Sequence, residues 1–152
     1  MLEARLEQDI KTALLGGDKQ TATTLRGLKS ALLYAKVADG KRDSGLTDEE
    51  VIAILSKEAK KRQESADLYE QGGNSEKAAA ELAEKKLIEQ YLPAQLSEAE
   101  IATVIDEAIK SSGAGDMKAM GQVIGAVKAK LGASADGAVI ARLVKEKLGA
   151  AQ

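Results

Sequence analysis

Cysteine and histidine are both absent from this sequence of 152 residues, and their absence excludes several chemistries. Without cysteine there is no disulfide, no thiolate nucleophile and no cysteine-ligated zinc or iron–sulfur centre. Without histidine there is no Ser-His-Asp triad and no imidazole base. A metal ion would need oxygen ligands alone, and no loop of the Asp-x-Asp-x-Asp-Gly type is present. The sequence therefore predicts neither a metal nor a cofactor.

Aromatic residues are scarce: there is no Phe or Trp, and the tyrosines are Tyr34, Tyr69 and Tyr91. Because 44% of the residues are hydrophobic, a core must be built mostly from Leu, Ile, Val and Ala, a palette that suits helix packing. So few aromatics argue against the base stacking that single-strand binders use. Recognition of the backbone and shape of a folded RNA stays open.

Long apolar runs are also missing. No run approaches the roughly 20 residues that span a bilayer. Charges stand at Glu3, Arg5 and Glu7, where a signal peptide would need an apolar segment. We therefore expect a cytoplasmic protein with no membrane partner.

Apolar residues recur with helical spacing along the whole sequence, and no strand pattern competes, so we expect an all-α fold of about seven helices. Breaks in the pattern predict two subdomains, one of four helices over residues 1–93 and one of three helices over residues 94–152. In the first subdomain we expect one helix that ends at Gly16-Gly17 and three more, over about 21–38, from Asp48 to Gly72-Gly73, and from Ser75 to Pro93. In the second we expect helices from Ser97 to a break at 111–115, from Asp116 to Gly132, and over about 136–148.

Capping residues fix several of these helix ends. Thr47 with Glu50, and Ser97 with Glu100, have the spacing of a capping box, in which the hydroxyl and the glutamate each accept from a backbone N–H of the first turn. Ser75 and Asp116 are further candidate N-caps. The acidic run at 48–50 is explained by its place in a first helical turn, because the helix dipole favours acidic residues there.

Two short motifs resemble catalytic or nucleotide sites, but neither is complete. Ser111-Ser112-Gly113 is similar to the nucleophile loop of amidases, yet no adjacent base or oxyanion site accompanies it, so the end of a helix is favoured. Gly132 and Gly137 have the glycine spacing of a phosphate loop, but Ala138-Val139 stands where Lys-Ser or Lys-Thr is required. We predict no catalytic residue and no nucleotide site.

Lys118, Gly121, Gly125 and Lys128 are spaced 3, 4 and 3 and so share one face of a helix, which we call the glycine face. Glycine inside a helix costs up to about 1 kcal/mol relative to alanine, so a pair needs a reason. One explanation is tight packing against a neighbouring helix. The other is that a sugar–phosphate chain lies against the bare helix while the lysines contact phosphates.

Basic residues gather near the end of the chain, where residues 108–152 have a net charge of +4. Arg142 and Lys145 lie on one face of the last helix and could extend the glycine face, although a solvated face explains them equally well. The basic run at 57–62 is interleaved with Glu58 and followed by Glu64. For that run, ordinary salt-bridged exposure is favoured over RNA contact.

Several runs together resemble the GatB/YqeY family across nearly the whole chain. They are residues 25–31 (LRGLKSA), 57–65 (KEAKKRQES), 91–96 (YLPAQL), 117–125 (MKAMGQVIG) and Asp136-Gly137. The resemblance implies a free-standing helical relative of the C-terminal domain of the B subunit of the tRNA-dependent amidotransferase. In that enzyme the domain grips the outer corner of tRNA, while other domains and subunits do the chemistry. Members of the family carry the label of carbon–nitrogen ligases with glutamine as amido donor.

The resemblance also implies an RNA-binding set. It comprises Lys118, Met120, Gly121, Gly125, Lys128, Asp136, Gly137, Arg142 and Lys145. Many relatives have basic residues where this chain has Ser134 and Ala138, which weakens the proposed phosphate surface. Relatives also have a large aliphatic residue at the position of Gly27, and its loss predicts a looser first subdomain.

The leading hypothesis is a noncatalytic tRNA-binding module related to glutamine-dependent tRNA amidation. Its partners would be tRNA and either a tRNA-dependent amidotransferase or an aminoacyl-tRNA synthetase. The alternative is a helical protein–protein adaptor with no RNA ligand, whose glycine face packs on a partner helix. A self-sufficient amidotransferase is disfavoured because neither a nucleophile site nor an ATP site is found.

Overall fold

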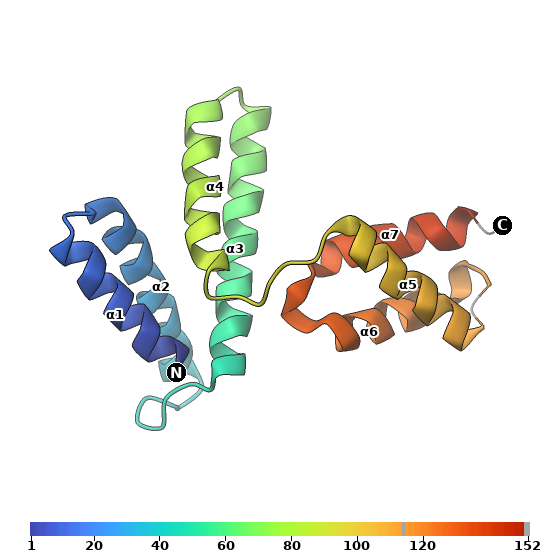
Figure 1. Ribbon diagram of the computed structural model, residues 1–152, viewed down its shortest axis with the longest axis horizontal. Helices are drawn as coiled ribbons and strands as arrows, with labels where there is room; N and C mark the ends of the chain where they lie inside the picture. The colour runs from blue at the N-terminus through green and yellow to red at the C-terminus, as the bar shows by residue number, and fades with distance from the viewer. Residues whose placement is uncertain (114, 151–152) are drawn as a thin grey trace. The chain divides into compact units, whose positions relative to one another are not determined.

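The computed structural model describes residues 1–113 and 115–150 (Figure 1). Within these residues the protein has seven α-helices, two short 3₁₀ helices and no strand, which confirms the expected all-α fold. The chain divides into two compact units, an N-terminal unit of Met1–Leu92 and a C-terminal unit of Pro93–Gln152. No helix in the described residues is long and apolar enough to cross a membrane.

The N-terminal unit consists of two helical hairpins. Its helices are α1 (Leu2–Leu15), α2 (Lys19–Ala38), α3 (Asp48–Gln71) and α4 (Ser75–Glu89). Thr47 forms the predicted capping box with Glu50 and so fixes the start of α3. Gly17 and Gly73, both at positive φ, make the turns that follow α1 and α3.

Three predicted helix ends in this unit are wrong by a few residues. α2 begins at Lys19 instead of Thr21, because the Asp18 carboxylate accepts from the Thr21 N–H and caps the helix. Asn74, and not Ser75, caps α4 by accepting from the Lys77 N–H. α4 ends at Glu89, four residues before Pro93, because Pro93 has no N–H to donate to the Glu89 carbonyl and its ring would clash with that carbonyl. The Leu92 N–H donates to the Glu89 carbonyl in a turn instead.

The core of the N-terminal unit is aliphatic, as the composition requires. Its buried members are Leu6, Ile10, Leu25, Leu28, Leu32, Val51, Leu55, Ala59, Ile88 and Tyr91. Tyr91 joins the end of α4 to α1, since its hydroxyl donates to Asp9 and Arg5 lies 4.7 Å from its ring centre. Burial, reinforced by the hydrogen bond to Asp9, raises the pKa of Tyr91. This contact holds α1 against the end of the second hairpin.

α3 and α4 lie side by side along a long hairpin (Figure 1). Small residues, Ala66 and Ala78, are buried between them. Arg62 bridges the hairpin by pairing with Glu58 on its own helix and with Glu84 on α4. The salt bridges predicted for the basic run are present at Lys61 and Arg62, which both pair with Glu58, although the Arg62 side chain is only 21% exposed. Lys57 and Lys60 are exposed and have no ion pair among the described residues.

Gly27 lies in the middle of α2 on its exposed side, and a Cβ built there would meet no atom within 4 Å. The missing side chain therefore leaves no hole in the core. The loosening expected from the departure at this position has no basis in packing.

Replacing Gly27 by alanine is expected to stabilise the N-terminal unit by about 1 kcal/mol, because alanine is the better helix former and open space receives its methyl group. Urea unfolding of the wild type and of Gly27→Ala at low protein concentration measures the difference. A loss of stability would show that α2 is not regular at this position.

The C-terminal unit is a three-helix bundle with 3₁₀ turns at both ends of its middle helix. Its elements are α5 (Glu98–Ser112), η1 (Met117–Ala119), α6 (Met120–Leu131), η2 (Gly132–Ser134) and α7 (Gly137–Ala150). The predicted capping box of Ser97 and Glu100 is present at the start of α5. The segment before α5 is tied to η2, since the Leu96 N–H donates to the Ser134 carbonyl at 2.8 Å.

The core of the C-terminal unit is formed by the inner faces of its three helices. The buried members are Ile101, Ile105, Val123, Val127, Ile140, Leu143, Val144 and Leu148. Val123 and Val127 are the buried residues that α6 contributes, each 1% exposed. Met117, Met120, Ile124 and Leu131 are only partly buried at the edge of the core.

The two serines of the suspected nucleophile loop lie in the last turn of α5, which Gly113 ends at a φ of 68°. The interpretation as a helix end is thus confirmed. Ala114, which belongs to the predicted break, lies outside the described residues. In the described part of the chain no three acidic side chains are grouped so that they could hold a metal ion.

Candidate nucleic-acid interface

The segment that carries the glycine face begins with a 3₁₀ turn. Asp116 accepts from the Lys118 N–H at 2.9 Å and caps η1, as the sequence predicted for the start of this segment. The α-helix itself starts only at Met120, so Lys118 lies one turn before α6. The single helix that was predicted from Asp116 to Gly132 is therefore divided into η1 and α6. The Lys118 side chain is exposed on η1.

Gly121 and Gly125 lie inside α6, and both are exposed. A Cβ built at either position would meet no atom within 4 Å. Packing against a neighbouring helix of the same chain, which was one of the two explanations, is therefore wrong for the described structure. The stability cost of the two glycines has no internal compensation.

Lys128 joins this face to the start of α7. Its Cε and Nζ atoms lie 2.9 and 3.2 Å from the place where a Cβ of Gly137 would stand, so the missing side chain of Gly137 makes room for the end of the lysine. Next to it, Asp136 accepts from the Ala138 N–H at 2.8 Å and caps α7. The structure thus places two of the predicted site residues, Lys128 at the end of α6 and Gly137 at the start of α7, in close contact.

Only some of the cations in this unit are available to a ligand. Arg142 pairs with Glu98 and Glu146, and these carboxylates raise the pKa of its guanidinium, first of all through the hydrogen bond that Arg142 donates to Glu146. Lys130 and Lys147 pair with carboxylates of α5. The remaining cations of residues 115–150 have no carboxylate within ion-pair distance among the described residues: they are Lys118, Lys128 and Lys145.

The predicted site residues are not all equivalent in the structure. Met120 is partly buried and packs against the core of the unit, so its main contacts are internal. Arg142 is held by two carboxylates, and it is a weaker candidate for phosphate contact than Lys145 on the same helix. The exposed and unpaired part of the set is formed by the glycine face with Lys145.

The glycine face has positive charge and exposed backbone, and it has no group that could act as a catalytic nucleophile or base. Residues 93–152 contain no aromatic side chain on which a base could stack. Two ammonium groups without an ion pair among the described residues flank a helix on which Gly121 and Gly125 expose backbone, a surface suited to a polyanionic backbone.

Comparison with known families gives one finding over nearly the whole chain. A family model described as "Yqey-like protein" matches residues 3–148. The match covers both units and includes every residue of the predicted RNA-binding set. The comparison with curated proteins gives no match.

Proposed function

The chain belongs to the YqeY-like family, and from this premise we propose that it is a noncatalytic tRNA-binding module related to glutamine-dependent amidation of tRNA. The glycine face of the C-terminal unit is the proposed contact surface. Its protein partner in this role would be a tRNA-dependent amidotransferase or an aminoacyl-tRNA synthetase. The module would supply binding, and the partner would supply the chemistry.

One observation carries the proposal: among the described residues, a Cβ built at either of two exposed helical glycines meets no atom within 4 Å, and the lysines on either side of them in sequence have no ion pair. Because each glycine costs about 1 kcal/mol relative to alanine, contact with an external group gives the pair a purpose. A sugar–phosphate backbone fits, since it can approach the bare helix while the ammonium groups contact phosphates. Without aromatic residues in this unit, recognition would depend on backbone and shape.

Replacing both glycines by alanine should raise the stability of the C-terminal unit and lower its affinity for tRNA. We expect Gly121→Ala/Gly125→Ala to stabilise the C-terminal unit by up to about 2 kcal/mol, because both methyl groups enter open space. We expect the same variant to bind bulk tRNA more weakly, since the methyl groups hold the backbone away. Thermal unfolding and a tRNA titration measure the two effects.

Gly149→Ala is the matched control, because Gly149 is also an exposed helical glycine with no atom within 4 Å of a built Cβ, but it lies near the end of α7. It should leave tRNA affinity unchanged. Equal affinity of the wild type and the double variant for tRNA would exclude the glycine face as the contact surface.

The alternative, a protein–protein adaptor, is supported by the same open glycines, since a partner helix could also approach them. Salt separates the two functions. A complex with tRNA weakens steeply as salt rises because counterions are released, whereas a complex held by packing of a partner helix on Gly121 and Gly125 depends much less on salt. A tRNA affinity that is no stronger than non-specific background at low salt would favour the adaptor.

A further inference from the structure

In the N-terminal unit α2 has an exposed apolar face that nothing in the described chain covers. Leu33, Tyr34 and Val37 are 51%, 79% and 57% exposed, and their spacing places them on one side of the helix. One to two turns earlier, the same side carries Gly27 and Ser30, which are also exposed. The face therefore has a large apolar half and a small half, with Ser30 between them.

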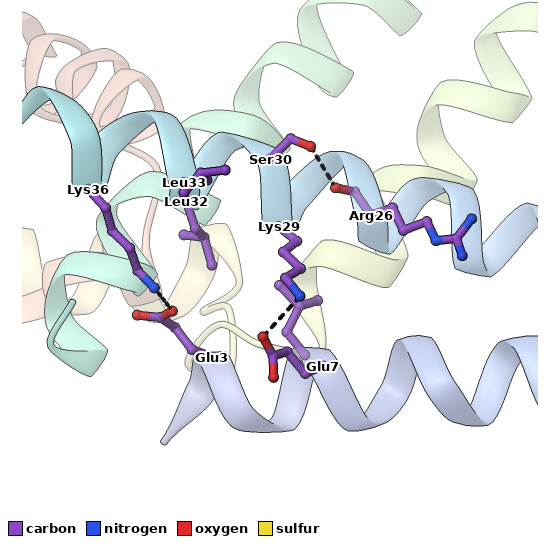
Figure 2. A pocket seen from close by; sticks show the side chains of 9 residues that line it. Glu3, Glu7, Arg26, Lys29, Ser30, Leu32, Leu33 and Lys36 are labelled. Atoms are coloured by element: carbon purple, nitrogen blue, oxygen red, sulfur yellow. Dashed lines mark hydrogen bonds and ion pairs between the residues drawn. The ribbon is translucent and has the colours of Figure 1, made fainter. Parts of the chain in front are cut away.

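The adjacent side of α2 is occupied by α1. Figure 2 shows Lys29 and Lys36 turned toward α1, where they pair with Glu7 and Glu3, the first pair at 3.0 Å. Ser30 lies at the other edge of this groove of about 380 Å³. Lys29 and Lys36 are thus neutralised within the chain, while Arg26, which also lines the groove, has no ion pair among the described residues. The outer face of α2 is left for an external partner.

Among the described residues, the Arg26 guanidinium has no ion pair and the Tyr34 ring has no cation over it. The other two tyrosines each have a cation over the ring, Arg5 at 4.7 Å from Tyr91 and Lys77 at 5.7 Å from Tyr69. No cation lies over Tyr34 in the described part of the chain, and the Arg26 guanidinium has no ion pair there. An arginine over a tyrosine ring is a favourable contact, and it becomes stronger when the pair is desolvated.

We propose that a second copy of this chain covers the face, with two α2 helices packed antiparallel about a two-fold axis at Ser30. In that register Tyr34 lies opposite Arg26 of the second copy, and Leu33 lies opposite its Gly27. The large half of each helix meets the small half of the other, and Arg26 reaches the ring of Tyr34. Such a contact is self-complementary, as a two-fold interface must be.

A parallel pairing does not share these properties. It would place the two Arg26 side chains against each other, and their like charges would repel. It would also place the two Gly27 residues opposite each other, which would leave unfilled space between the helices. The antiparallel register avoids both, and the small residues let the helix axes approach within the usual range of about 8–10 Å.

The interface is small, so the dimer is weak. A contact through one helix face buries less surface than the lower limit of a standard stable interface, which is about 1,200 Å². We therefore expect a dissociation constant of roughly 10–100 µM for the dimer. The protein would then be monomeric when dilute and dimeric at high local concentration.

Ser30→Cys tests the register directly, because the chain has no other cysteine. At the two-fold axis the two thiols lie close enough for a disulfide, which needs Cα atoms within about 7 Å. Under mild oxidation we expect the cross-linked dimer of Ser30→Cys to form about ten times faster than that of Ser75→Cys, an exposed control at the start of α4. Equal rates for the two variants would overturn the proposed register.

Sedimentation of the uncross-linked protein over a range of concentrations gives the second test. Tyr34→Glu should stay monomeric where the wild type dimerises. Leu68→Glu, which changes a 67%-exposed leucine of α3 outside this face, should dimerise like the wild type. Circular dichroism verifies that both variants are folded. A wild type that stays monomeric at the highest concentration, or equal losses in the two variants, would refute the proposal.

Discussion

We expect the double substitution Lys118→Glu/Lys128→Glu to reduce the affinity for bulk tRNA to the level of non-specific binding, roughly 10⁻⁴ to 10⁻⁶ M. The two lysines flank the glycine face, and neither has a carboxylate partner among the described residues. Reversing them removes two proposed phosphate contacts and places two like charges beside the phosphates. A titration of tRNA at low and at physiological salt measures the loss.

The salt dependence gives a second, independent readout of the same experiment. Each phosphate that a cation neutralises contributes about 0.9 to the slope of log K against log salt on duplex nucleic acid. The double variant should therefore have a slope smaller by about 2 if both lysines contact phosphates. An unchanged slope would place the contacts elsewhere on the protein.

Lys57→Glu/Lys60→Glu is the matched control for this experiment. Both residues are exposed on α3 and have no ion-pair partner in the described structure, and the change in formal charge is the same. This control should retain nearly all of the affinity. If it loses as much as the test variant, the binding depends on net charge and the glycine face is not a site.

The helices could be predicted from the sequence because their signals are local. The capping boxes of Thr47 and Ser97 each need only two residues three positions apart, and both are present in the structure. Errors of one or two residues arose where neighbours compete, as at Asn74 and Ser75, since both side chains can cap a helix.

The state of the candidate site could not be predicted, because it depends on contacts between residues far apart in the sequence. Arg142 pairs with Glu98, 44 positions earlier, and Lys147 pairs with Asp106, 41 positions earlier. The spacing of Arg142 and Glu146 does indicate a local salt bridge, but no local pattern indicates that Lys147 is paired while Lys118 and Lys145 are not. The open space above Gly121 and Gly125 is likewise a property of the folded bundle.

Cavities in the two cores are expected to destabilise different parts of the protein. Leu28 and Ile140 are both 0% exposed, and they belong to the core clusters of the N-terminal and C-terminal units respectively. Replacing either by alanine should cost about 2–5 kcal/mol. Because each cluster lies within one unit, hydrogen exchange should increase in the unit that contains the substitution. Equal increases in both units would show that they unfold together.

The same pair of variants connects stability to the proposed function. A unit of the size of the C-terminal one has only about 3–9 kcal/mol of total stability, so Ile140→Ala should leave much of it unfolded near body temperature. Since the glycine face depends on that fold, tRNA binding should be lost in Ile140→Ala and restored by cooling, while Leu28→Ala should keep it. If Leu28→Ala loses binding and Ile140→Ala does not, the RNA contact belongs to the N-terminal unit, and its free cations, beginning with Lys57 and Lys60, become the candidates.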